Sequence, residues 1–568
     1  MNTAQTPMYE WKDLPWRKIE RAVFKLQKRI YQASRNDDVK AVHRLQRLFL
    51  KSWSAKCLAV RRVTQDNHGK KTAGVDGIKA LSPAQRLALV RKLGDQHKPK
   101  PVRRVWIPKT GTSEKRPLGI PTMKDRAEQT LVKMALEPEW EAKFEPNSYG
   151  FRPGRSCHDA ITAIHININK QPKYVLDTDI SKCFDKIAHT PLLKKLETFP
   201  SLGRQIKAWL TAGMMDGSEL FANITGVPQG GPLSPLLANV ALHGLETAIR
   251  EAFPRTYIHT DKRKRGYPTV VRYADDLVAL HSDLEVITKT QQLISNWLHD
   301  MGLELKPSKT RITHTLYPHE GNLGFDFLGF HVRQYRVGKT HSGKNPQGEV
   351  LGFKTIIKPS DEAIQRHDQS IRTTIRKLQN APQAALIKQL NPIIRGWTNY
   401  YSPVASKRTF ANLSHRMYLK LRRWTKRRHT NWSGKRVARK YWRLEKGHWD
   451  FATKEGLSLY RHTQTPIRRY PKVQGTRSPY DGDWVYWGKR LGRHPQLPKR
   501  VAQLLQRQKG KCAWCGLYFH EKDQPEIDHI IPQANGGMNK VDNWQLLHRH
   551  CHDCKTAEDI NLSIERCS

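Results

Sequence analysis

The sequence has few acidic residues and no long apolar segment. No run of about 18 apolar residues occurs, so we expect no membrane-spanning helix. The first residues, "MNTAQTPMYEWKD", contain no apolar core of the kind that secretory signals carry. Only 51 Asp and Glu stand against 99 Lys and Arg, which gives a formal net charge of +48 and a pI near 10.1. An excess this large predicts a polyanionic partner, because phosphates that basic side chains neutralise release their counterions.

Cysteine is also scarce, and its placement excludes a disulfide framework. Five of the eight cysteines lie near the C-terminus: Cys512, Cys515, Cys551, Cys554 and Cys567. The others are scattered: Cys57, Cys157 and Cys183. This distribution favours a reducing compartment and one terminal metal site. Two Cys-x2-Cys pairs supply four thiolates, which suit a closed tetrahedral structural zinc site: Cys512, Cys515, Cys551 and Cys554.

A chain of 568 residues is too long for one hydrophobic core, so we expect three or more folded units. Residues 16–50 show the spacing of two amphipathic helices with basic residues around the apolar face. Between about 100 and 335, strand-like runs alternate with helical patterns, and a helical region follows at about 360–430. Residues 440–505 hold few periodic runs. The candidate strands are residues 103–108, 173–180, 269–280 and 326–333.

Two adjacent carboxylates interrupt one of these candidate strands. In "VVRYADDLVAL" (270–280), Asp275 and Asp276 stand between apolar runs. An unpaired buried carboxylate is very unfavourable, so a divalent cation at a strand end would explain the pair. A second acidic strand, "YVLDTDI", places Asp177 and Asp179 on one face. Together the two strands could hold Mg²⁺ for phosphoryl transfer, although "YADD" alone is also typical of a surface turn.

The motif "YADD" is similar to the catalytic motif of reverse transcriptases, and the chain resembles group II intron-encoded proteins over nearly its whole length. The blocks that carry the resemblance occur in the expected order: "KRPLGIPTMKDR" (115–126), "SYGFRPGRSCHDAI" (148–161), "LDTDISKCFDKI" (176–187), "GVPQGGPLSPLLANV" (226–240), "GLELKPSKT" (302–310), "FDFLGFHV" (325–332) and "LNPIIRGWTNYY" (390–401). The resemblance implies a multidomain α/β and α fold. This would be a right-hand polymerase with α/β fingers and palm and a helical thumb, followed by a zinc-stabilised ββα-metal (HNH) domain.

The same blocks imply domain boundaries. These are 1–85 for a basic helical RNA-binding extension, 86–338 for the reverse transcriptase fingers and palm, 339–440 for the maturase or thumb domain, 441–505 for a DNA-binding segment and 506–568 for the HNH domain. The DNA-binding segment is assigned from its position along the chain, because its own motif is weak.

In the polymerase part, the resemblance implies that Asp179, Asp275 and Asp276 are the metal ligands. Asp179 is preferred to Asp177 because the family's aromatic residue lies five positions after the ligand, and Phe184 stands there. Asp177 is then a hydrogen-bonding or solvated neighbour. Phe184 resembles the steric gate of reverse transcriptases, whose ring would clash with a ribose 2′-OH. A plain core phenylalanine is the alternative.

The nucleotide contacts that the resemblance implies are Lys109, Arg116 and Gln229. Lys109 and Arg116 lie in "IPKTGTSEKRPLG" and would meet the triphosphate of an incoming nucleotide. This loop is one residue longer than common forms, which leaves the register of Lys109 open, and a solvated basic loop is the alternative. Gln229 and Gly230 would form a tight backbone surface near the incoming base, or only a turn.

Residues 407–440 contain 13 Lys or Arg and no acidic residue. Apolar residues recur there at helical spacing: Leu413, Met417, Leu421 and Trp424. A helix that is apolar on one face and wholly basic on the other predicts a phosphate backbone as partner, while its aromatic residues would stack on bases or simply join the core. The residues that we expect to bind nucleic acid are Arg422, Arg423, Lys426, Arg427 and Arg428.

Residues 526–552 resemble an HNH endonuclease. The resemblance rests on "EIDHIIP" (526–532), "NGG" (535–537) and "DNWQLLHRHCH" (542–552). A zinc finger that only binds is the alternative. His548 and His550 receive no role and are expected at the solvated surface.

The HNH resemblance implies a role for each of four residues. His529 would be the general base that activates water, and Asn543 would orient it. Asp528 and His552 would bind one catalytic divalent ion, Mg²⁺ or a similar metal. A neutral histidine suits this chemistry near neutral pH.

These resemblances imply a protein that binds its intron RNA, assists splicing, nicks target double-stranded DNA and copies the intron from the nicked 3′ end. The implied partners and cofactors are group II intron RNA, target DNA, dNTPs, Mg²⁺ and structural Zn²⁺. We expect a cytoplasmic location, in a bacterium or an organellar matrix and close to the nucleoid. Two other functions stay open: a maturase that only binds RNA, which would not need clustered acids, and a reverse transcriptase of a retroelement or phage-defence system.

Overall fold

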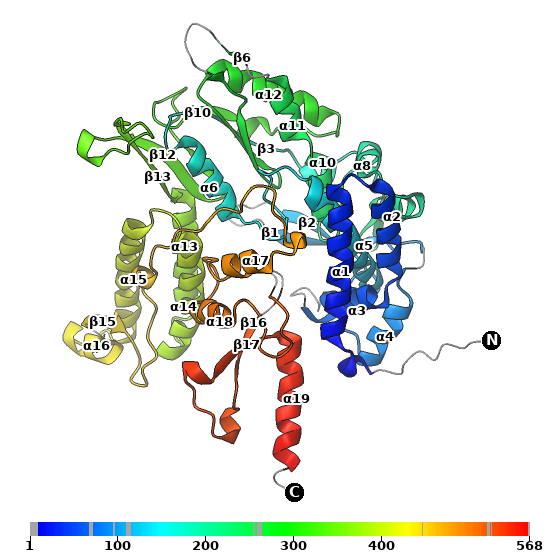
Figure 1. Ribbon diagram of the computed structural model, residues 1–568. Coiled ribbons are helices and arrows are strands. Elements are labelled where there is room, and N and C mark those ends of the chain that lie inside the picture. The colour runs from blue at the N-terminus through cyan, green and yellow to red at the C-terminus, as the bar shows by residue number, and fades with distance from the viewer. Residues whose placement is uncertain are drawn as a thin grey trace.

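The computed structural model describes residues 10–66, 72–94, 97–108, 115–253, 256–257, 264–445, 447–519, 523 and 525–565 (Figure 1). The N-terminal helices are α1 (Trp16–Arg35), α2 (Val39–Lys51), α3 (Trp53–Arg61) and α4 (Pro83–Arg91). The two amphipathic helices expected at 16–50 are thus confirmed as α1 and α2. Within the described part of the chain, no helix is long and apolar enough to cross a membrane.

Helix α1 packs along α5 (Met123–Lys143), and the two share a buried core with α2 and α3. The apolar face of α1 carries Ile19 and Val23 into this core. Two buried polar side chains of α1 bond the backbone of α5: Gln27 Nε2 donates to Met134 O at 2.9 Å, and Ser34 Oγ donates to Glu139 O at 3.0 Å. The N-terminal helices are therefore an integral part of the polymerase body.

The fingers sheet has the order β2-β1-β4-β5. Its strands are β1 (Val102–Pro108), β2 (Lys115–Ile120), β4 (Met214–Asp216) and β5 (Glu219–Phe221). Strands β1 and β2 are antiparallel neighbours, and β4 joins β1 in parallel. The loop that contains Gln229 and Gly230 lies against β2, because Gly119 N donates to Gln229 O at 2.5 Å.

The palm sheet has the order β10-β3-β9-β8, with every neighbouring pair antiparallel. Its strands are β3 (Tyr174–Asp179), β8 (Thr269–Tyr273), β9 (Asp276–His281) and β10 (Arg311–His314). A short strand pair, β6 (Thr256–Tyr257) and β7 (Lys264–Arg265), precedes β8. The helices around the sheet are α6 (Cys157–Ile168), α7 (Cys183–Lys186), α8 (His189–Leu196), α9 (Pro200–Leu210), α10 (Ser234–Leu242), α11 (Leu245–Ala252) and α12 (Leu284–His299).

The single strand expected over residues 269–280 is wrong, because β8 and β9 form a tight hairpin. Tyr273 pairs with Asp276, so Ala274 and Asp275 are the two turn residues. Ala274 has φ +57°, the left-handed conformation that such hairpin turns require. The apolar pattern continues through the turn and hides it in the sequence.

The strand expected at 326–333 is wrong for the same reason. It is divided into β11 (Phe325–Phe327) and β12 (Phe330–Arg336), and β13 (Phe353–Pro359) completes a three-stranded sheet. Leu328 and Gly329 form the turn, both with positive φ (52° and 79°). Two-residue turns of this kind reverse the chain without interrupting the apolar pattern.

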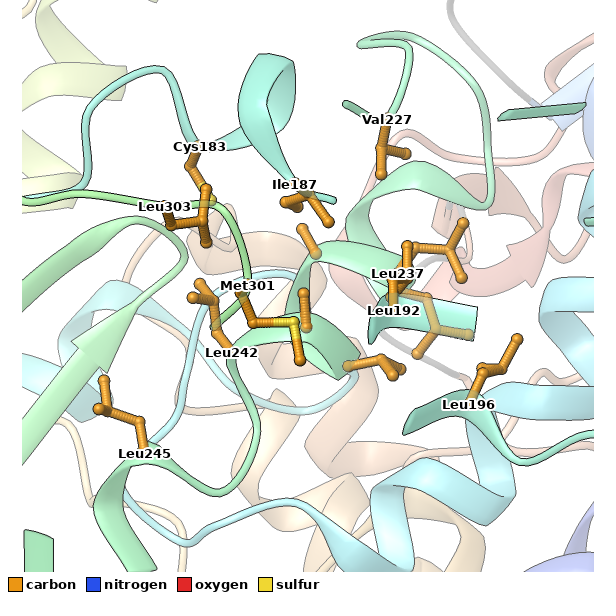
Figure 2. Packing of buried hydrophobic residues seen from close by; sticks show 14 of the residues in the cluster. Cys183, Ile187, Leu192, Leu196, Val227, Leu237, Leu242, Leu245, Met301 and Leu303 are labelled. Carbon is orange, nitrogen blue, oxygen red and sulfur yellow. The ribbon is translucent and has the colours of Figure 1, made fainter. Parts of the chain in front are cut away.

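A large hydrophobic core lies beneath the palm sheet and joins it to α7, α8, α10 and the segment after α12 (Figure 2). Figure 2 shows Cys183, Ile187 and Val227 pointing into this core, together with Met301 and Leu303 from the segment that follows α12. Cys183 and Ile187 are almost fully buried, at 3% and 0% exposure. The core therefore fixes both ends of the short helix α7, which carries Phe184.

The thumb is helical, as expected for residues 360–430. It contains α13 (Asp361–Lys377), α14 (Gln383–Tyr401), α15 (Lys407–Arg428) and α16 (Gly434–Tyr441), followed by the hairpin β14 (Trp442–Glu445) and β15 (His448–Phe451). The apolar face predicted for α15 is confirmed, since all four of its residues are buried: Leu413, Met417, Leu421 and Trp424. The basic residues of α15 are left on the outside of the thumb.

Residues 452–498 are mostly loop, with one α-helix, α17 (Trp484–Leu491), and two short 3-10 helices. This connector passes from the thumb back over the palm (Figure 1). Arg490 forms a buried ion pair with Asp159 of α6 at 2.6 Å, and Tyr480 Oη donates to Glu137 of α5 at 2.8 Å. A large part of the segment that the sequence assigns to DNA binding is therefore tied to the polymerase body.

A compact unit closes the chain, at the opposite end of the molecule from α12 (Figure 1). It contains α18 (Lys499–Arg507), β16 (Pro525–His529), β17 (Trp544–His548) and α19 (Arg549–Glu565). Its core includes Leu504 and Leu505, so the unit extends into α18, before the boundary predicted at residue 506. The unit touches α1, where His550 Nε2 lies 3.6 Å from Glu20 Oε1.

Candidate active sites

The three acids that the sequence groups lie together at one end of the palm sheet. Asp179 ends β3 and Asp276 begins β9, and the two are direct partners in the antiparallel register. Asp275 stands in the adjoining turn, where its carbonyl accepts a hydrogen bond of 3.2 Å from Ile180 N. Backbone pairing of two strands, supported by the core below them, thus brings the carboxylates to one place.

The acids hold an excess of negative charge. Burial, together with the charges of Asp275 and Asp179, raises the pKa of Asp276 to about 7. Burial also raises the pKa of Asp275, and Asp179 adds to that effect. Lys309 Nζ donates to Asp179 Oδ2 at 2.6 Å. Although burial alone would lower the pKa of Lys309, this hydrogen bond and the nearby acids raise it.

This donor set fits a hard divalent cation, because Mg²⁺ takes carboxylate oxygens and would relieve the repulsion that raises the pKa of Asp276. The palm carboxylates are less tightly gathered than the cysteine and histidine group described below, and Asp179 is paired with Lys309. Asp177 lies beside the site as the hydrogen-bonding neighbour that we expected, since Arg311 Nη2 donates to it at 2.8 Å.

Phe184 lies on α7, shortly after the end of β3, and Gln229 lies in a loop against β2. Phe184 is half-buried, its ring packs on the palm core, and it meets the ring of Phe151 edge to face with centroids 6.0 Å apart. Burial raises the pKa of Asp275, and the charge of Arg116 opposes that rise, so Arg116 faces the acids from β2. Lys109 lies outside the described residues.

The terminal unit gathers three cysteines and one histidine. Ligand atoms of Cys512, Cys515, His548 and Cys551 all lie within 4.8 Å of one another, and Cys515 Sγ is 3.4 Å from His548 Nδ1. A tetrahedral zinc site separates its ligand atoms by about 3.5–3.8 Å. Hydrogen bonds from Cys515 and Cys551 lower the pKa of the Cys512 thiol, while hydrogen bonds with Cys512 and Cys515 raise the pKa of Cys551. Both the donor set and its spacing fit structural zinc.

This cluster corrects two expectations. Cys554, expected as the fourth ligand, is not part of the group, and His548 takes that place. His548 ends β17 beside Cys551 and is only 3% exposed, whereas Cys554 lies one helical turn further along α19. The expectation that His548 and His550 lie at the solvated surface is therefore wrong, since the side chain of His550 is also mostly covered, at 15% exposure.

Asp528 and His552 lie close together, and His529 follows Asp528 at the end of β16. Asp528 Oδ1 is 3.5 Å from His552 Nε2, a separation that suits two ligands of one divalent ion. His552 Nδ1 pairs with Glu526 Oε2 at 2.7 Å, which orients its other nitrogen toward Asp528. A pocket of about 280 Å³ opens over Asp528 and His529, which leaves room for a phosphate group.

Asn543 does not touch the His529 ring; it ties together the loop that follows. Its Nδ2 donates to Ile531 O and Met538 O, both at 2.9 Å, and its Oδ1 accepts from Ile531 N at 2.9 Å. It therefore acts on His529 only through the loop backbone.

The side chain that reaches the His529 ring is Asn539. His529 Nε2 lies 3.3 Å from Asn539 Oδ1, and the same oxygen accepts from Trp544 Nε1 at 3.0 Å. An indole N–H can only donate, so the shared Asn539 atom is the carbonyl oxygen. Nε2 of His529 then carries the hydrogen, and Nδ1 is left as the basic nitrogen.

Four protein families match successive parts of the chain: the N-terminal domain of reverse transcriptase at residues 11–93, reverse transcriptase (RNA-dependent DNA polymerase) at 107–332, the group II intron, maturase-specific domain at 364–442 and HNH endonuclease at 512–558. Protein YkfC of Escherichia coli (strain K12) is 31% identical over 351 residues, which are 55% of this chain and 89% of that protein. The group II intron-encoded protein LtrA of Lactococcus lactis subsp. cremoris is 29% identical over 425 residues, or 62% of this chain and 69% of LtrA.

The chain belongs to the group II intron-encoded proteins. It combines a reverse transcriptase, a maturase domain and an HNH endonuclease, so it is both an RNA-directed DNA polymerase and a DNA endonuclease. Binding of intron RNA follows from the maturase and reverse transcriptase domains.

In this intron-encoded protein, the thumb carries a basic groove of about 440 Å³ between α13 and α15. Its arginines come from both helices: Arg372, Arg376, Arg416, Arg423 and Arg427. Arg422 and Lys426 are exposed on α15 outside the groove. Arg428 differs from the other residues expected to bind nucleic acid, because its guanidinium donates to Gln379 O and Ala381 O and lies over the Trp424 ring.

Sequence reasoning did not single out several residues of these sites. Lys309 stands in the block "GLELKPSKT", three residues after Lys306, whose backbone N donates to Asp179 O at 2.8 Å. His548 precedes Cys551 at the same spacing as a Cys-x2-Cys pair, which is the signal that could have identified it. Asn539 and Phe151 give no such signal, because their contacts depend on a loop and on a strained turn.

Proposed function

We propose that this group II intron-encoded protein nicks one strand of a target DNA and extends the new 3′ end by copying its intron RNA. The observation that carries the proposal is that one chain combines a carboxylate pair in strand register with a second group, Asp528 and His552, whose spacing suits a divalent ion. A protein that only bound RNA would need neither group. The two chemistries are sequential, because the first supplies the primer that the second consumes.

In the polymerase, Asp179, Asp275 and Asp276 would hold Mg²⁺, which when bound supplies positive charge to the transferring phosphoryl group. The chain's own residues position the reactants. Arg116, with its planar donor fork, would meet the triphosphate, and Lys109 would add a second positive charge. The loop of Gln229, tied to β2, would line the place of the incoming base.

Phe184 would select deoxyribonucleotides. Its short helix α7 is fixed at both ends by the palm core, so the ring cannot easily move away from a sugar placed above it. A 2′-OH would then clash with the ring, whereas a deoxyribose would fit. The half-exposed position of Phe184 beside the acids supports this role over that of a fully buried core residue.

The thumb would bind the RNA through its basic outer face. Arg423 and Arg427 line the groove between α13 and α15, and Arg422 and Lys426 extend the positive charge beyond it. Phosphate contacts of this kind provide affinity without sequence selectivity, and they weaken as salt concentration rises. Arg428 would contribute by holding the end of α13 in place.

The HNH unit would make the nick. His529 Nδ1 would accept a proton from water as that water attacks a DNA phosphate. Asp528 and His552 would hold a divalent ion, which when bound stabilises the charge that develops on the phosphate. Zinc held by Cys512, Cys515, His548 and Cys551 would be structural.

The domain limits follow from these roles. The polymerase would end near 338 and the thumb near 440, and the endonuclease unit would begin with α18. The connector before α18 would carry DNA contacts on its exposed side. A bacterial cytoplasm or an organellar matrix, close to the nucleoid, would bring the protein together with both its RNA and its DNA target.

The test combines the protein with intron RNA, transcribed from the DNA that flanks its coding sequence, a target duplex labelled on either strand, and dNTPs. The expected product is intron cDNA joined covalently to the 3′ end of one nicked strand. A matched duplex that is already nicked and carries a 3′-dideoxy end should give no such product, while the same duplex with a 3′-OH should. Synthesis that proceeds equally from the dideoxy duplex would overturn the proposal, because the nick would then not be the primer.

A further inference from the structure

Phe151 has a backbone conformation that phenylalanine rarely adopts. Its φ is +61°, in the left-handed region, where a side chain other than that of glycine is disfavoured. The ring is 46% exposed, and among the described residues Phe151 belongs to none of the buried hydrophobic clusters. The strain is therefore not offset by burial of the ring in a core. Strained residues of this kind persist where their surroundings fix them, and they gather at functional sites.

The backbone before Phe151 is fixed against the catalytic hairpin. Tyr149 N donates to Arg272 O at 2.9 Å, which docks this segment alongside β8. Gly150 lies so close to the turn that a Cβ atom there would come within 2.3 Å of Ala274 N. Asn239 Nδ2 also donates to Gly150 O at 2.8 Å.

The backbone after Phe151 is fixed by a buried ion pair. Arg152 meets both oxygens of Glu141 on α5, at 2.8 and 2.9 Å, and both side chains are 1% exposed. The same guanidinium donates to the carbonyls of Glu145 and Ser148 at 2.7 and 2.9 Å. With its neighbours held on both sides, the backbone of Phe151 is fixed, and its ring lies against that of Phe184.

The ring of Phe151 contacts Phe184. The two ring planes stand at 80°, with centroids 6.0 Å apart, which is the preferred edge-to-face arrangement. The backbone of Phe184 is fixed independently: its carbonyl accepts from Val227 N at 2.6 Å, and Gly226 approaches it too closely for any side chain. The backbone contacts do not by themselves fix the side chain of Phe184. Its ring packs on the palm core on one side, and the contact with Phe151 further restricts its rotation.

We propose that Phe151 is a positioning residue for sugar selection, which holds the Phe184 ring in the orientation that excludes a 2′-OH. The inference rests on the proposed role of Phe184. The strained turn sets the Phe151 ring, the ring sets the rotamer of Phe184, and Phe184 meets the sugar. Loss of Phe151 would let the Phe184 ring tilt away and would admit ribonucleotides while leaving the catalytic acids in place.

The test is primer extension on an RNA template with a DNA primer, with kcat/KM measured for one dNTP and its matching rNTP on the same preparation. The ratio of the two constants is unaffected by the fraction of protein that is folded. Phe184→Ala should lower the preference for dNTP by about ten- to a hundredfold. Phe151→Ala should lower it by about two- to tenfold, the range that an edge-to-face aromatic pair contributes.

Further variants distinguish the effect of removing the Phe151 ring from the effect of changing its backbone conformation. Phe151→Gly removes the ring but accepts φ +61° without strain, so it should relax sugar selection as Phe151→Ala does. Phe151→Tyr keeps the ring edge and should restore most of the preference. The double variant should match Phe184→Ala alone, because Phe151 acts only through that ring. Trp53→Ala, a change at an aromatic residue that is 41% exposed on the distant helix α3, should leave the ratio unchanged.

The outcomes separate this inference from the role of Phe184. If Phe184→Ala leaves the ratio unchanged, the steric gate itself is wrong. If Phe184→Ala relaxes selection and Phe151→Ala does not, only the role of Phe151 is overturned. The role is also overturned if Phe151→Gly behaves like the wild type, since the effect of alanine would then come from the backbone, or if the two substitutions are fully additive.

Discussion

Asp179 and Asp276 are direct partners on neighbouring strands of a four-stranded sheet that rests on a large hydrophobic core. His529, by contrast, ends one strand of a two-stranded sheet and is followed by a loop. The palm carboxylates are placed by backbone hydrogen bonds. In the terminal unit, the cysteine and histidine cluster gathers parts of the chain that lie far apart in sequence, and the side chain of Asn543 ties the loop after His529.

The two sites are held in place differently because the hydrophobic cores beneath them differ in size. A large core fixes the strands whatever the catalytic side chains are, so a carboxylate can be changed there with little effect on the fold. The terminal unit buries less apolar surface, so we expect its fold to depend on zinc and on side-chain hydrogen bonds. Single substitutions should therefore separate chemistry from folding in the palm. In the terminal unit, substitution of a residue of the cysteine and histidine cluster, or of Asn543, should instead affect folding and chemistry together.

The largest effect is expected for Asp275→Asn. The change removes charge with little change of volume, so the protein should stay folded and still bind intron RNA and nick DNA. DNA synthesis with Mg²⁺ should fall by about three orders of magnitude or more, because the charge that holds the ion is lost. Primer extension, thermal unfolding and the nicking assay on one preparation measure all three properties. Near-normal synthesis would contradict the assignment of the acids.

In the cysteine and histidine cluster, unlike in the palm, we expect one substitution to remove both the local fold and the activity. His548→Ala should release zinc and unfold the terminal unit, because thiolate and imidazole binding energy is folding energy there. Nicking should disappear while primer extension stays. Cys554→Ala is the matched control, since Cys554 lies outside the cluster, and it should keep one zinc per chain. Zinc content by mass spectrometry and protease resistance of the terminal unit are the measurements. Zinc loss from the Cys554 variant alone would restore the four-cysteine set.

The palm was predictable because its signals are local and periodic. The alternation of "YVLDTDI" placed Asp177 and Asp179 on one face, and the order of the blocks indicated the fold. The hairpin turn at Ala274 was missed, because its apolar flanks look like one strand and nothing in the sequence marks a left-handed alanine. Phe151 was missed for a related reason. Its position depends on the ion pair between Arg152 and Glu141, and neither of these residues has a catalytic role that would draw attention to it.

The terminal unit was less predictable. Two Cys-x2-Cys pairs suggested four thiolates, yet a His-x2-Cys spacing overlaps the second pair, and spacing alone cannot choose between them. The fold decides, because the end of β17 directs His548 inward while α19 carries Cys554 past the cluster. Asn543 was recognised, but its contacts depend on how residues 531–538 close the loop.

An intermediate effect is expected for His529→Ala. Nicking should fall by about 10²–10⁴-fold, the usual contribution of a general base, with zinc bound and the unit folded. Primer extension from a supplied 3′-OH should be unchanged. The change thus tests whether chemistry can be separated from folding in the terminal unit at all. Normal nicking by this variant would mean that the unit is a zinc-stabilised DNA-binding module.

The smallest effects are expected for the two asparagines, Asn543 and Asn539, and their substitutions should affect different properties. Asn543→Ala removes three loop hydrogen bonds and should lower the free energy of unfolding of the terminal unit by about 1–3 kcal/mol, with nicking reduced in proportion to the folded fraction. Asn539→Ala removes the contact with His529 and should lower nicking about tenfold with less effect on unfolding, because the imidazole loses the partner that keeps its hydrogen on Nε2.

Asn539→Asp tests whether the contact between Asn539 and His529 controls the protonation of the imidazole. A carboxylate still accepts from Nε2 and from Trp544, so nicking should be retained at alkaline pH, where the imidazole is neutral. The new negative charge beside the imidazole stabilises its protonated form, which should move the acid limb of the pH–rate profile to higher pH. A residue that merely supported the loop would change the rate at every pH alike. If Asn539→Asp and Asn539→Ala lose the same activity with an unshifted profile, Asn539 is structural, and the terminal unit holds its base through Asn543 alone.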